Sequence, residues 1–451
     1  MRTKTVKKIS VKRPAAPAAG ANKLISIRIP EKTIKDLQTQ AGKKGDLGYQ
    51  QLIKAYIANG LAEEGSERDG SPAGILHPLR TDNPPAGTQT QKKSRKIKKE
   101  SADIPHVMQE DIEALGKIFK PHLKHFAGKT FLITGAFGFL GRYMVHLLHY
   151  LNEKMLDEKC RGLLLDNFVT GYEQRIVSDQ SLVFYRHDVI KPFQTDAKID
   201  YIIHAAGIAS PVYYTKFPIE TMDVGTMGTR HMLDLARQKN VKSFIFMSSS
   251  EVYGDPDPAH VPTREDYNGN VSVNGPRSCY DESKRFGETM CMAYWRVYNV
   301  PVKIIRPFNV YGPGIRPDDY RVLPNFIEHA LRKEPLPVHG HGRNTRSFCY
   351  INDEIEAIFK ILFSSHDGEP FNVGNPSPEI SVRELAQLVA GAMPHKVSVV
   401  SIDPPHAVYA NSDPKRRCPD ITKLVKLTGF QPRVGLKEGL QRTIRWFQEF
   451  N

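Results

Sequence analysis

Two short segments carry residue types suited to acid–base chemistry. Tyr280 and Lys284 are four residues apart, which places a phenol and an ammonium one turn apart on one face of a helix. An ammonium lowers the pKa of a nearby phenol, so we expect tyrosinate to act as a base near neutral pH. About thirty residues earlier, an apolar run ends in Ser249-Ser250-Glu251. A strand there would bring a hydroxyl and a carboxylate to the same sheet edge as the tyrosine.

A glycine-rich segment follows the first apolar run of the large C-terminal region. Phe131 to Thr134 has the pattern of a strand, and Gly-x-x-Gly-x-x-Gly and an amphipathic helix follow it. Such glycines allow a tight turn and place a pyrophosphate on the helix N-terminus. Asp166, at the end of the next strand, can accept hydrogen bonds from ribose hydroxyls and would repel a 2′-phosphate, which favours NAD over NADP. The alternative for Asp166 is a strand-end residue that caps a turn.

Asp188-Val189, after the following strand, is a candidate adenine contact. The residues that we expect to bind the cofactor are Gly135, Gly138, Phe139, Leu140, Gly141, Asp166, Asn167, Asp188, Val189, Ala205, Tyr280 and Lys284.

The chain divides into four segments of different composition. Residues 1–22 are basic and rich in Ala and Pro, and we expect them to be disordered. Residues 23–64 are patterned, and residues 65–101 have the Gly, Pro, Ser and Lys content of a linker. From residue 102 to 451, β-branched apolar runs alternate with helical patterns. This alternation predicts an α/β fold with a Rossmann-type, doubly wound parallel sheet and a smaller C-terminal α/β substrate region.

The charge of the chain is concentrated at its N-terminus. The net charge is +14 over 451 residues, yet residues 1–100 carry 21 basic and 9 acidic residues, so the remainder is nearly neutral. No apolar run is long enough to span a membrane, and the basic start lacks the apolar core of a secretory signal. The five scattered cysteines form no CxxC and no Cys/His cluster, so we expect no metal site. We therefore expect a soluble, cytoplasmic protein.

The N-terminal patterned segment begins with an alternating strand. Ile25, Ile27 and Ile29 share one face of Lys23–Pro30, and two short helical patterns follow. About forty residues cannot bury enough surface alone, so we expect two copies to pair their strands into a ribbon. The segment resembles ribbon-helix-helix repressors and antitoxins. That resemblance implies that Ser26 and Arg28 face DNA bases and that Lys23 contacts phosphate. The alternative is a dimerisation element whose basic flank is only solvated.

Residues 129–450 resemble the extended short-chain dehydrogenase/reductase superfamily of nucleotide-sugar enzymes, also called the NAD-dependent epimerase/dehydratase family. The segments SEVYGDP, NGPRSCYDESKRFGET, RPFNVYGPG, TRSFCYINDEIEAI, FNVGNP and RRCPDITKL look like those of UDP-glucuronate decarboxylases. The resemblance implies roles for several residues: Tyr280 as base, Lys284 as its electrostatic partner, Ser249 as hydroxyl orienter, Ser250 and Glu251 as active-site residues, Arg346 as partner of the substrate carboxylate or proton donor, Asn309 as a substrate contact, and Arg321 and Arg417 as diphosphate ligands. Surface ion pairing is the alternative for Arg321 and Arg417.

The resemblance implies decarboxylation of UDP-glucuronate to UDP-xylose through a 4-keto intermediate, with NAD regenerated. The loops His204–Pro211 and Met222–Gly228 differ from the decarboxylase pattern, so a 4-epimerase or a 4,6-dehydratase stays open. A third hypothesis is an NAD-responsive, DNA-binding regulator with a vestigial enzyme body. The expected partners are a UDP-sugar, a second copy of the chain that pairs through two helices per subunit, and DNA at the N-terminal module; no membrane is expected.

Overall fold

A computed structural model describes residues 6–12, 24–30, 105–171, 179–403 and 413–450. The chain separates into two compact units, Met1–Lys96 and Ile97–Asn451. Among the described residues, no helix is both long and apolar enough to cross a membrane.

The N-terminal unit contains a two-stranded antiparallel sheet. Strand β2 (Leu24–Pro30) lies where the alternating pattern predicts a strand, and it pairs with β1 (Val6–Lys12). The expectation of disorder over residues 1–22 is therefore wrong for Val6–Lys12. The register places Ile9 opposite Ile27, so β1 supplies an apolar alternation that matches β2 within one chain. Pairing of β2 between two copies of the chain stays a prediction. The two expected helices, Lys23 and the linker lie outside the described residues.

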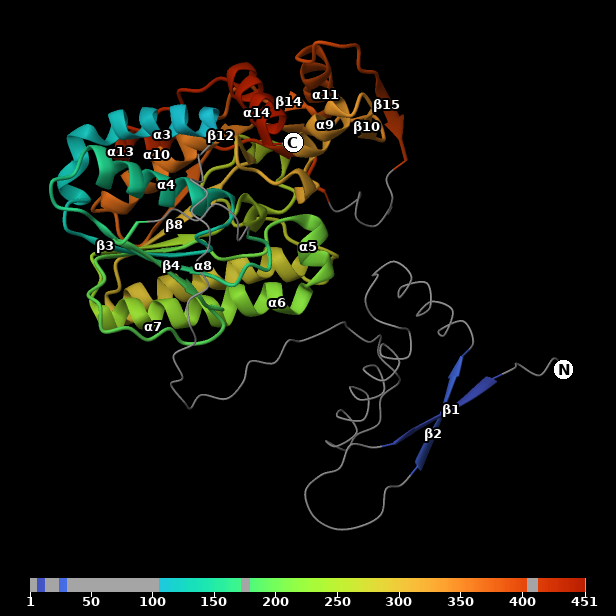
Figure 1. The fold of residues 1–451 in the computed structure, drawn as a ribbon. Helices are drawn as coiled ribbons and strands as arrows, with labels where there is room; N and C mark the ends of the chain where they lie inside the picture. Colours follow the sequence, from blue (N-terminus) through green and yellow to red (C-terminus); the bar gives the residue numbers. More distant parts are fainter. Residues whose placement is uncertain (1–5, 13–23, 31–104, 172–178, 404–412, 451) are drawn as a thin grey trace. The chain divides into compact units, whose positions relative to one another are not determined.

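The second unit is built on a seven-stranded parallel sheet, which confirms the predicted fold class (Figure 1). Its strands, in spatial order, are β13 (Glu369–Val373), β8 (Val302–Pro307), β7 (Ser243–Met247), β6 (Tyr201–His204), β3 (Thr130–Thr134), β4 (Arg161–Asp166) and β5 (Leu182–Arg186). The first strand of this sheet along the chain, β3, lies inside the sheet, and the order runs outward from it in both directions. The sheet is doubly wound, and ligands bind such sheets where the strand order reverses, at the carboxyl ends of the strands.

Helices cover both faces of this sheet (Figure 1). On one face pack α3 (His106–Phe119), α4 (Phe139–Lys154) and α10 (Ile351–Phe363), and on the other lie α7 (Thr229–Lys239) and α8 (Ser278–Tyr298). Each face has its own apolar core, because strand residues alternate between them. Ile133 of β3 joins the core with α4 and α10, and its neighbour Leu132 joins the core with α7 and α8.

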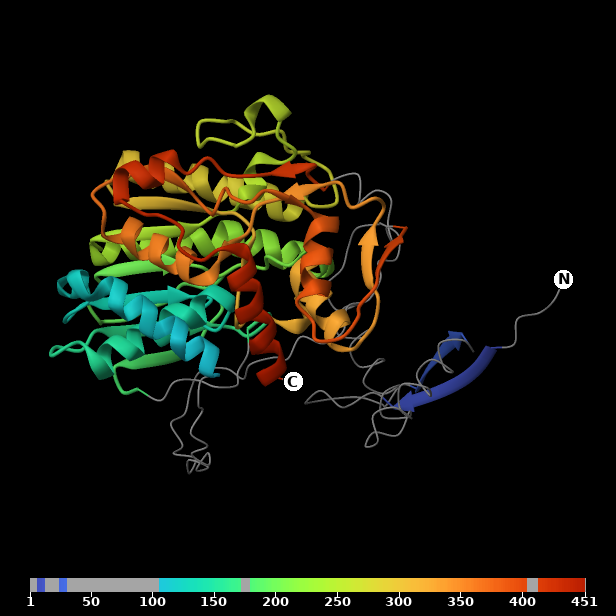
Figure 2. The same ribbon diagram turned by 90° about the horizontal axis from the view of Figure 1, so that it is seen from above.

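Helix α3 begins the second unit, and a buried carboxylate fixes it. Asp111 accepts hydrogen bonds from the hydroxyls of Tyr143 at 3.0 Å and Tyr350 at 2.6 Å, and it pairs with Arg442 at 2.7 Å. These partners belong to α4, β12 (Cys349–Tyr350) and α14 (Leu436–Phe450). In Figure 2, α3 lies beside α10 on the same face of the sheet. Helix α3 therefore belongs to the core of this unit.

Short sheets and helices form the smaller C-terminal region. The sheets are β10 (Leu336–His339) with β15 (Val399–Ile402), β14 (Ile380–Ser381) with β11 (Thr345–Arg346) and β16 (Arg416–Arg417), and β12 with β9 (Val310–Tyr311). Among the described residues, the other α-helices are α5 (Pro211–Lys216) and α6 (Pro218–Asp223), which precede α7, and α9 (Val322–Leu331), α11 (Val382–Gly391) and α13 (Thr422–Thr428), which come later in the chain. The π-helix η2 (Val224–Gly228) follows α6, and the 3₁₀ turns are η1 (Lys120–His125), η3 (Ser250–Tyr253), η4 (Pro258–His260) and η5 (Pro317–Asp319).

Candidate active site

The glycine turn joins β3 to α4 at the carboxyl edge of the sheet. Gly135 has a φ of +65°, and a Cβ there would lie 2.8 Å from the carbonyl oxygen of Ala205. A Cβ on Gly141 would lie 2.1 Å from the carbonyl oxygen of Gly135. Gly138 precedes the first turn of α4, which contains Phe139. Side chains would fill this cradle, so the turn fits a pyrophosphate held by backbone N–H groups.

Asp166 links the glycine turn to the next strand. Its Oδ2 accepts a hydrogen bond from the Phe137 N–H and its Oδ1 accepts one from the Phe168 N–H, both at 2.8 Å. Burial raises the pKa of Asp166, and the backbone hydrogen bonds oppose that shift. Asn167 and Asp188 also accept backbone N–H bonds, at 3.1 Å and 3.2 Å. The contacts expected to ribose and to adenine at Asp166 and at buried Val189 stay predictions.

His204 fixes the loop that faces the glycine turn, and it is not among the site residues that the sequence predicts. Its Nδ1 lies 2.8 Å from Thr134 Oγ1 and its Nε2 lies 3.3 Å from Thr229 Oγ1. Thr134 Oγ1 in turn accepts the Ala206 N–H at 3.1 Å. Burial and then Lys284 lower the pKa of His204 to about 3, so the imidazole is neutral. The position of His204 at the end of β6 is the signal that could have identified it.

Tyr280 and Lys284 lie together in the first turns of α8, as their spacing predicts. The Tyr280 side chain is buried and stacks on Tyr214, with ring centroids 5.2 Å apart. Lys284 Nζ donates to the Met247 carbonyl at 2.7 Å and lies 5.7 Å from the centre of the Tyr280 ring. The hydroxyl of Ser249 is within hydrogen-bond reach of Tyr280.

Burial dominates the pKa values of both groups. Burial raises the pKa of Tyr280 to about 12, although the hydrogen bond from Ser249 acts in the opposite direction. Burial also lowers the pKa of Lys284, to about 8. Neither residue is among the causes of the other's shift, so the lowering of the phenol pKa by the ammonium stays a prediction.

Glu251 lies in η3, directly after β7, within a group of arginines. It forms ion pairs with Arg277 and with Arg417, the latter at 2.7 Å. Burial would raise the pKa of Glu251, but Arg417, Arg277 and Arg346 lower it to about 2, so the carboxylate is ionised. Ser249 begins the same turn, and its Oγ accepts the Glu251 N–H at 3.2 Å. Ser250 is buried beside it.

The expected substrate residues gather around this carboxylate. Arg417 Nη1 donates to Asn309 Oδ1 at 3.5 Å, and Asn309 Nδ2 donates to the Ser347 carbonyl at 2.8 Å. Buried Arg346, on β11 next to β16, donates to the Thr345 carbonyl at 2.8 Å. Arg321 is paired with Asp319 and contributes a positive potential at Tyr280. The structure thus brings Glu251, Arg346, Asn309 and Arg417 together, with Arg321 nearer the tyrosine.

Comparison with known proteins agrees with this geometry. The family model described as "NAD dependent epimerase/dehydratase family" matches residues 131–374, which include the glycine turn, Glu251, Tyr280 and Arg346. The chain belongs to this family.

Family members of known activity match most of the second unit. UDP-glucuronic acid decarboxylase 2 of Arabidopsis thaliana is 39% identical over 325 residues, covering 71% of this chain and 69% of the relative. UDP-glucuronic acid decarboxylase 1 of Danio rerio is 38% identical, covering 71% and 72%.

Solved structures of the family superpose on the same region. The UDP-glucose 4-epimerase of Thermotoga maritima, bound to UDP-glucose, has a TM-score of 0.62 at 25% identity and covers 71% of this chain and 99% of its own. MoeE5 in complex with UDP-glucuronic acid and NAD has a TM-score of 0.59 at 25% identity, covering 71% and 100%. The family is NAD-dependent, and the glycine cradle of this member fits that cofactor.

Three charged residues of this family member escaped the sequence analysis. Arg277 pairs with Glu251 and lies 3.6 Å from Asp281, and Asp413 pairs with Arg346 at 2.8 Å. Burial and then the charge of Glu251 raise the pKa of Asp281 to about 7. Arg277 precedes Tyr280 by three residues and Asp281 by four, which places all three on neighbouring positions of one helix face. This spacing could have indicated Arg277 and Asp281 as site residues. Asp413 carried no such signal, because only the pairing of β11 with β16 brings it near.

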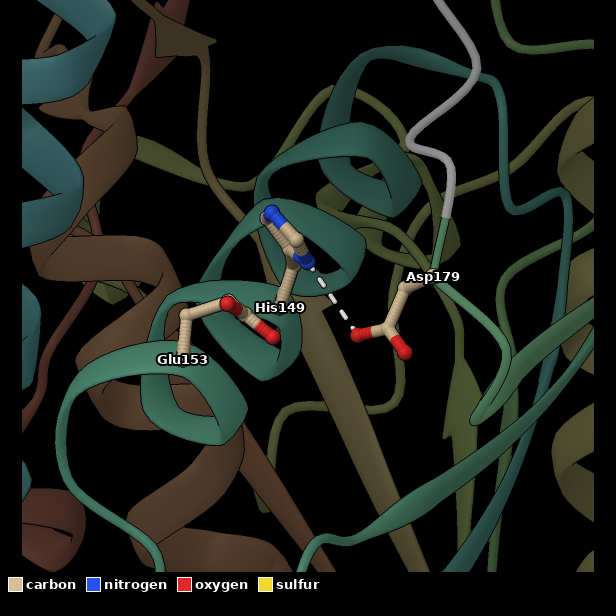
Figure 3. Close-up of side chains that lie close together, drawn as sticks. All are labelled: His149, Glu153 and Asp179. Carbon is tan, nitrogen blue, oxygen red and sulfur yellow. Dashed lines mark hydrogen bonds and ion pairs between the residues drawn. The ribbon is translucent and has the colours of Figure 1, made fainter.

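One group of side chains away from this site offers metal-ligand atoms (Figure 3). His149 Nδ1 lies 3.1 Å from Asp179 Oδ2, and Glu153 is one turn along α4 from His149. Lys159 already pairs with Glu153 at 2.7 Å, and Ser181 N–H donates to Asp179 at 2.8 Å. These contacts account for the group as hydrogen bonds and ion pairs, so we assign no ion to it.

Proposed function

We propose that the chain decarboxylates UDP-glucuronate to UDP-xylose in an NAD-dependent reaction through a 4-keto intermediate. The observation that carries this proposal is the set of buried guanidiniums around Glu251, next to Tyr280. Arg346 and its neighbours offer a site for a carboxylate, which a neutral hexose lacks. The 36–39% identity to UDP-glucuronic acid decarboxylases over most of their length supports the same substrate.

The residues of the site suit the steps of this reaction. NAD, when bound, supplies reversible hydride chemistry at C4 of the sugar. Tyr280, hydrogen-bonded to Ser249, would exchange a proton with the C4 hydroxyl. The phenol holds its proton near neutral pH in this structure, so its pKa must fall when the site is filled, and Lys284 is the nearby cation that can lower it.

The carboxylate of the 4-keto sugar is β to the ketone, which allows its loss as CO2. The C5–C6 bond breaks, its electrons form an enolate with the C4 ketone, and a proton adds at C5 before the ketone is reduced again. Arg346 would orient the departing carboxylate. We assign to the anionic Glu251 and to buried Ser250 the positioning of the water or acid that protonates C5.

Replacement of Arg346 tests this assignment against its alternative. Arg346→Met should reduce CO2 release from UDP-glucuronate by about 10²-fold or more, because a buried charge partner of the substrate is lost. Arg383→Met, which alters a partly exposed arginine that donates a hydrogen bond to Ser401, is the control. Continued CO2 release at the wild-type rate would contradict the proposal.

A 4-epimerase is the alternative function, with a 4,6-dehydratase behind it. The solved epimerases share the fold, and epimerisation uses the same tyrosine without a carboxylate partner. Ser250-Glu251 stands where dehydratases usually carry Asp-Glu, which disfavours dehydration. An epimerase would tolerate Arg346→Met and would interconvert UDP-hexoses without a change of mass.

We also propose that the chain forms a homodimer through α6, η2 and α8. Apolar side chains on these neighbouring elements are exposed, with Ile219 59% and Phe286 52% accessible and Met227 close to half accessible. A second copy would cover them. Light scattering should give twice the chain mass, and Phe286→Glu should shift it to the monomer; a monomeric wild type would contradict this proposal.

DNA binding by the N-terminal unit is a separate proposal. A two-stranded antiparallel ribbon fits the major groove, and the register places Lys8 opposite Arg28 and Ser10 opposite Ser26. A gel shift with the full chain at low salt should show retardation that Arg28→Glu abolishes, because phosphate contacts are strongest there. Absence of any retardation would refute it.

We propose the cytoplasm as the location. All five cysteines lie in the described part of the chain, and each is a free thiol. Free thiols persist in a reducing compartment. Cell fractionation that finds the protein outside the cytoplasm would contradict this.

A further inference from the structure

A carboxylate of the protein already contacts the arginine that we assign to the substrate's carboxylate. Asp413 Oδ2 accepts a hydrogen bond from Arg346 Nη2 at 2.8 Å, and its Oδ1 lies 3.6 Å from Arg277 Nη1. The two arginine side chains are 7% exposed, whereas the Asp413 side chain is 38% exposed. The carboxylate therefore approaches the two guanidiniums from the solvent side.

Arg346 has other partners that hold it in place. Its Nη1 donates to the Thr345 carbonyl at 2.8 Å and, at 3.4 Å, to the carbonyl of Lys415. The pairing of β11 with β16 fixes both of these strands, with Arg346 opposite Arg417. These backbone contacts do not depend on the Asp413 side chain, so Arg346 can keep its orientation when Asp413 leaves.

The other carboxylates of the group are held more firmly. Glu251 is shared by Arg277 and Arg417, and its side chain is only 14% exposed. Asp281 is buried against Arg277, 3.6 Å from its Nε. Asp413 is the most exposed of the three, and its departure would uncover Arg346, one side of Arg277 and the Asn344 amide, whose Nδ2 donates to Asp413 Oδ2 at 3.3 Å. It is thus the carboxylate that a ligand can replace most easily.

We propose that Asp413 is an internal competitor for the carboxylate subsite, which occupies Arg346 and Arg277 in the free protein and is displaced by the carboxylate of a nucleotide hexuronate. The proposal rests on the decarboxylase function. It makes Asp413 a specificity-determining residue. A hexuronate exchanges one carboxylate for another, whereas a neutral hexose offers Arg346 nothing in exchange, so Asp413 stays in place.

Binding of two nucleotide sugars that differ only at C6 tests this exchange. UDP-glucuronate and UDP-glucose are titrated by calorimetry, with NAD present, into the wild-type full chain, Asp413→Asn and Asp255→Asn. Asp413→Asn should bind UDP-glucuronate about twofold to fivefold more tightly, which is the range of a partly exposed ion pair. Its KM should fall by the same factor, its kcat should stay within about twofold, and its affinity for UDP-glucose should not change.

Asp255→Asn is the matched control. The Asp255 side chain is as exposed as that of Asp413, at 39%. It accepts a hydrogen bond at 2.8 Å from the N–H of Lys415, which lies in the same segment as Asp413. An asparagine can still accept that bond, so both affinities should equal those of the wild type. Asp413→Ala should behave as Asp413→Asn, and thermal unfolding confirms that each variant is folded.

Weaker binding of UDP-glucuronate by Asp413→Asn, or a fall in kcat, would overturn the proposal by making Asp413 a residue that positions Arg346. Unchanged affinity would overturn it as well. Failure of the decarboxylase function is distinguishable, because it shows in the wild type as absence of CO2 release, whatever the affinities of the variants.

Discussion

The cofactor side and the sugar side of the site are built from different interactions. On the cofactor side, glycine backbone and N–H groups set the geometry: Gly135 and Gly141 pack without room for a Cβ, and Asp166 accepts two backbone hydrogen bonds. On the sugar side, ion pairs join Glu251, Arg277 and Arg417.

This difference separates a rigid part of the site from an exchangeable one. A cradle of backbone atoms cannot change partners, so it suits a cofactor that all members of the family share. Guanidiniums and carboxylates can exchange partners at similar energy, so a group of them can discriminate between substrates by charge. We therefore expect substitutions on the two sides to have separable effects on NAD binding and on the charged part of the substrate.

The largest effect should follow Gly141→Ala on the cofactor side. The new Cβ would lie 2.1 Å from the Gly135 carbonyl oxygen, so the turn must open and the backbone N–H groups move. A displacement of this size should reduce turnover by about 10²-fold or more and weaken NAD binding, measured by calorimetry. Gly391→Ala, where a Cβ meets no atom within 4 Å, is the control. Normal NAD binding by Gly141→Ala would contradict the rigid cradle.

Glu251→Gln should lower the stability of the protein, in addition to the loss of turnover that follows from its proposed role at C5. It leaves Arg277 and Arg417 without their shared buried anion, and breaking a buried pair costs about 3–5 kcal/mol. Urea denaturation measures the loss, and NAD affinity should remain that of the wild type. Glu153→Gln, which breaks an exposed pair with Lys159, should leave the unfolding free energy unchanged. A parallel loss of NAD binding in Glu251→Gln would show that the two sides are not separable.

The smallest effect should be a change in pH dependence from Asp281→Asn. Burial and then Glu251 raise the pKa of Asp281 from 3.8 to about 7, so between these values the folded protein holds a proton that the unfolded chain has lost. This group therefore lowers the free energy of unfolding as the pH rises through that window. Urea midpoints at pH 4.5 to 7.5 should fall less steeply in the variant. A slope as steep as that of the wild type would exclude Asp281 as its source.

Local sequence patterns predicted the parts of the site that local geometry defines. The glycine turn needs only β3, the turn and α4, and Tyr280 with Lys284 needs only one helix. The doubly wound parallel sheet followed from the alternation of apolar runs and helices. Strand β1 was not predicted, because its apolar alternation consists only of Ile9 and Val11, with lysines on both sides.

Residues that act across the fold were harder to predict. Asp413 reaches Arg346 because β16 pairs with β11, which no local pattern encodes. The pKa of Tyr280 depends on burial against Tyr214, which comes from a separate helix, α5. Burial and long-range ion pairs are properties of the assembled core, so the spacing of residues along the chain could name the participants but could not give their charge states.

The most direct test of the proposed function is the mass of the product formed from UDP-glucuronate. The purified full chain is incubated with UDP-glucuronate and NAD, without added reductant, and the nucleotide sugars are separated and analysed by mass spectrometry. The account predicts a UDP-pentose, lighter than the substrate by the mass of CO2, with NAD unchanged in amount. A product of unchanged mass would establish an epimerase and contradict decarboxylation.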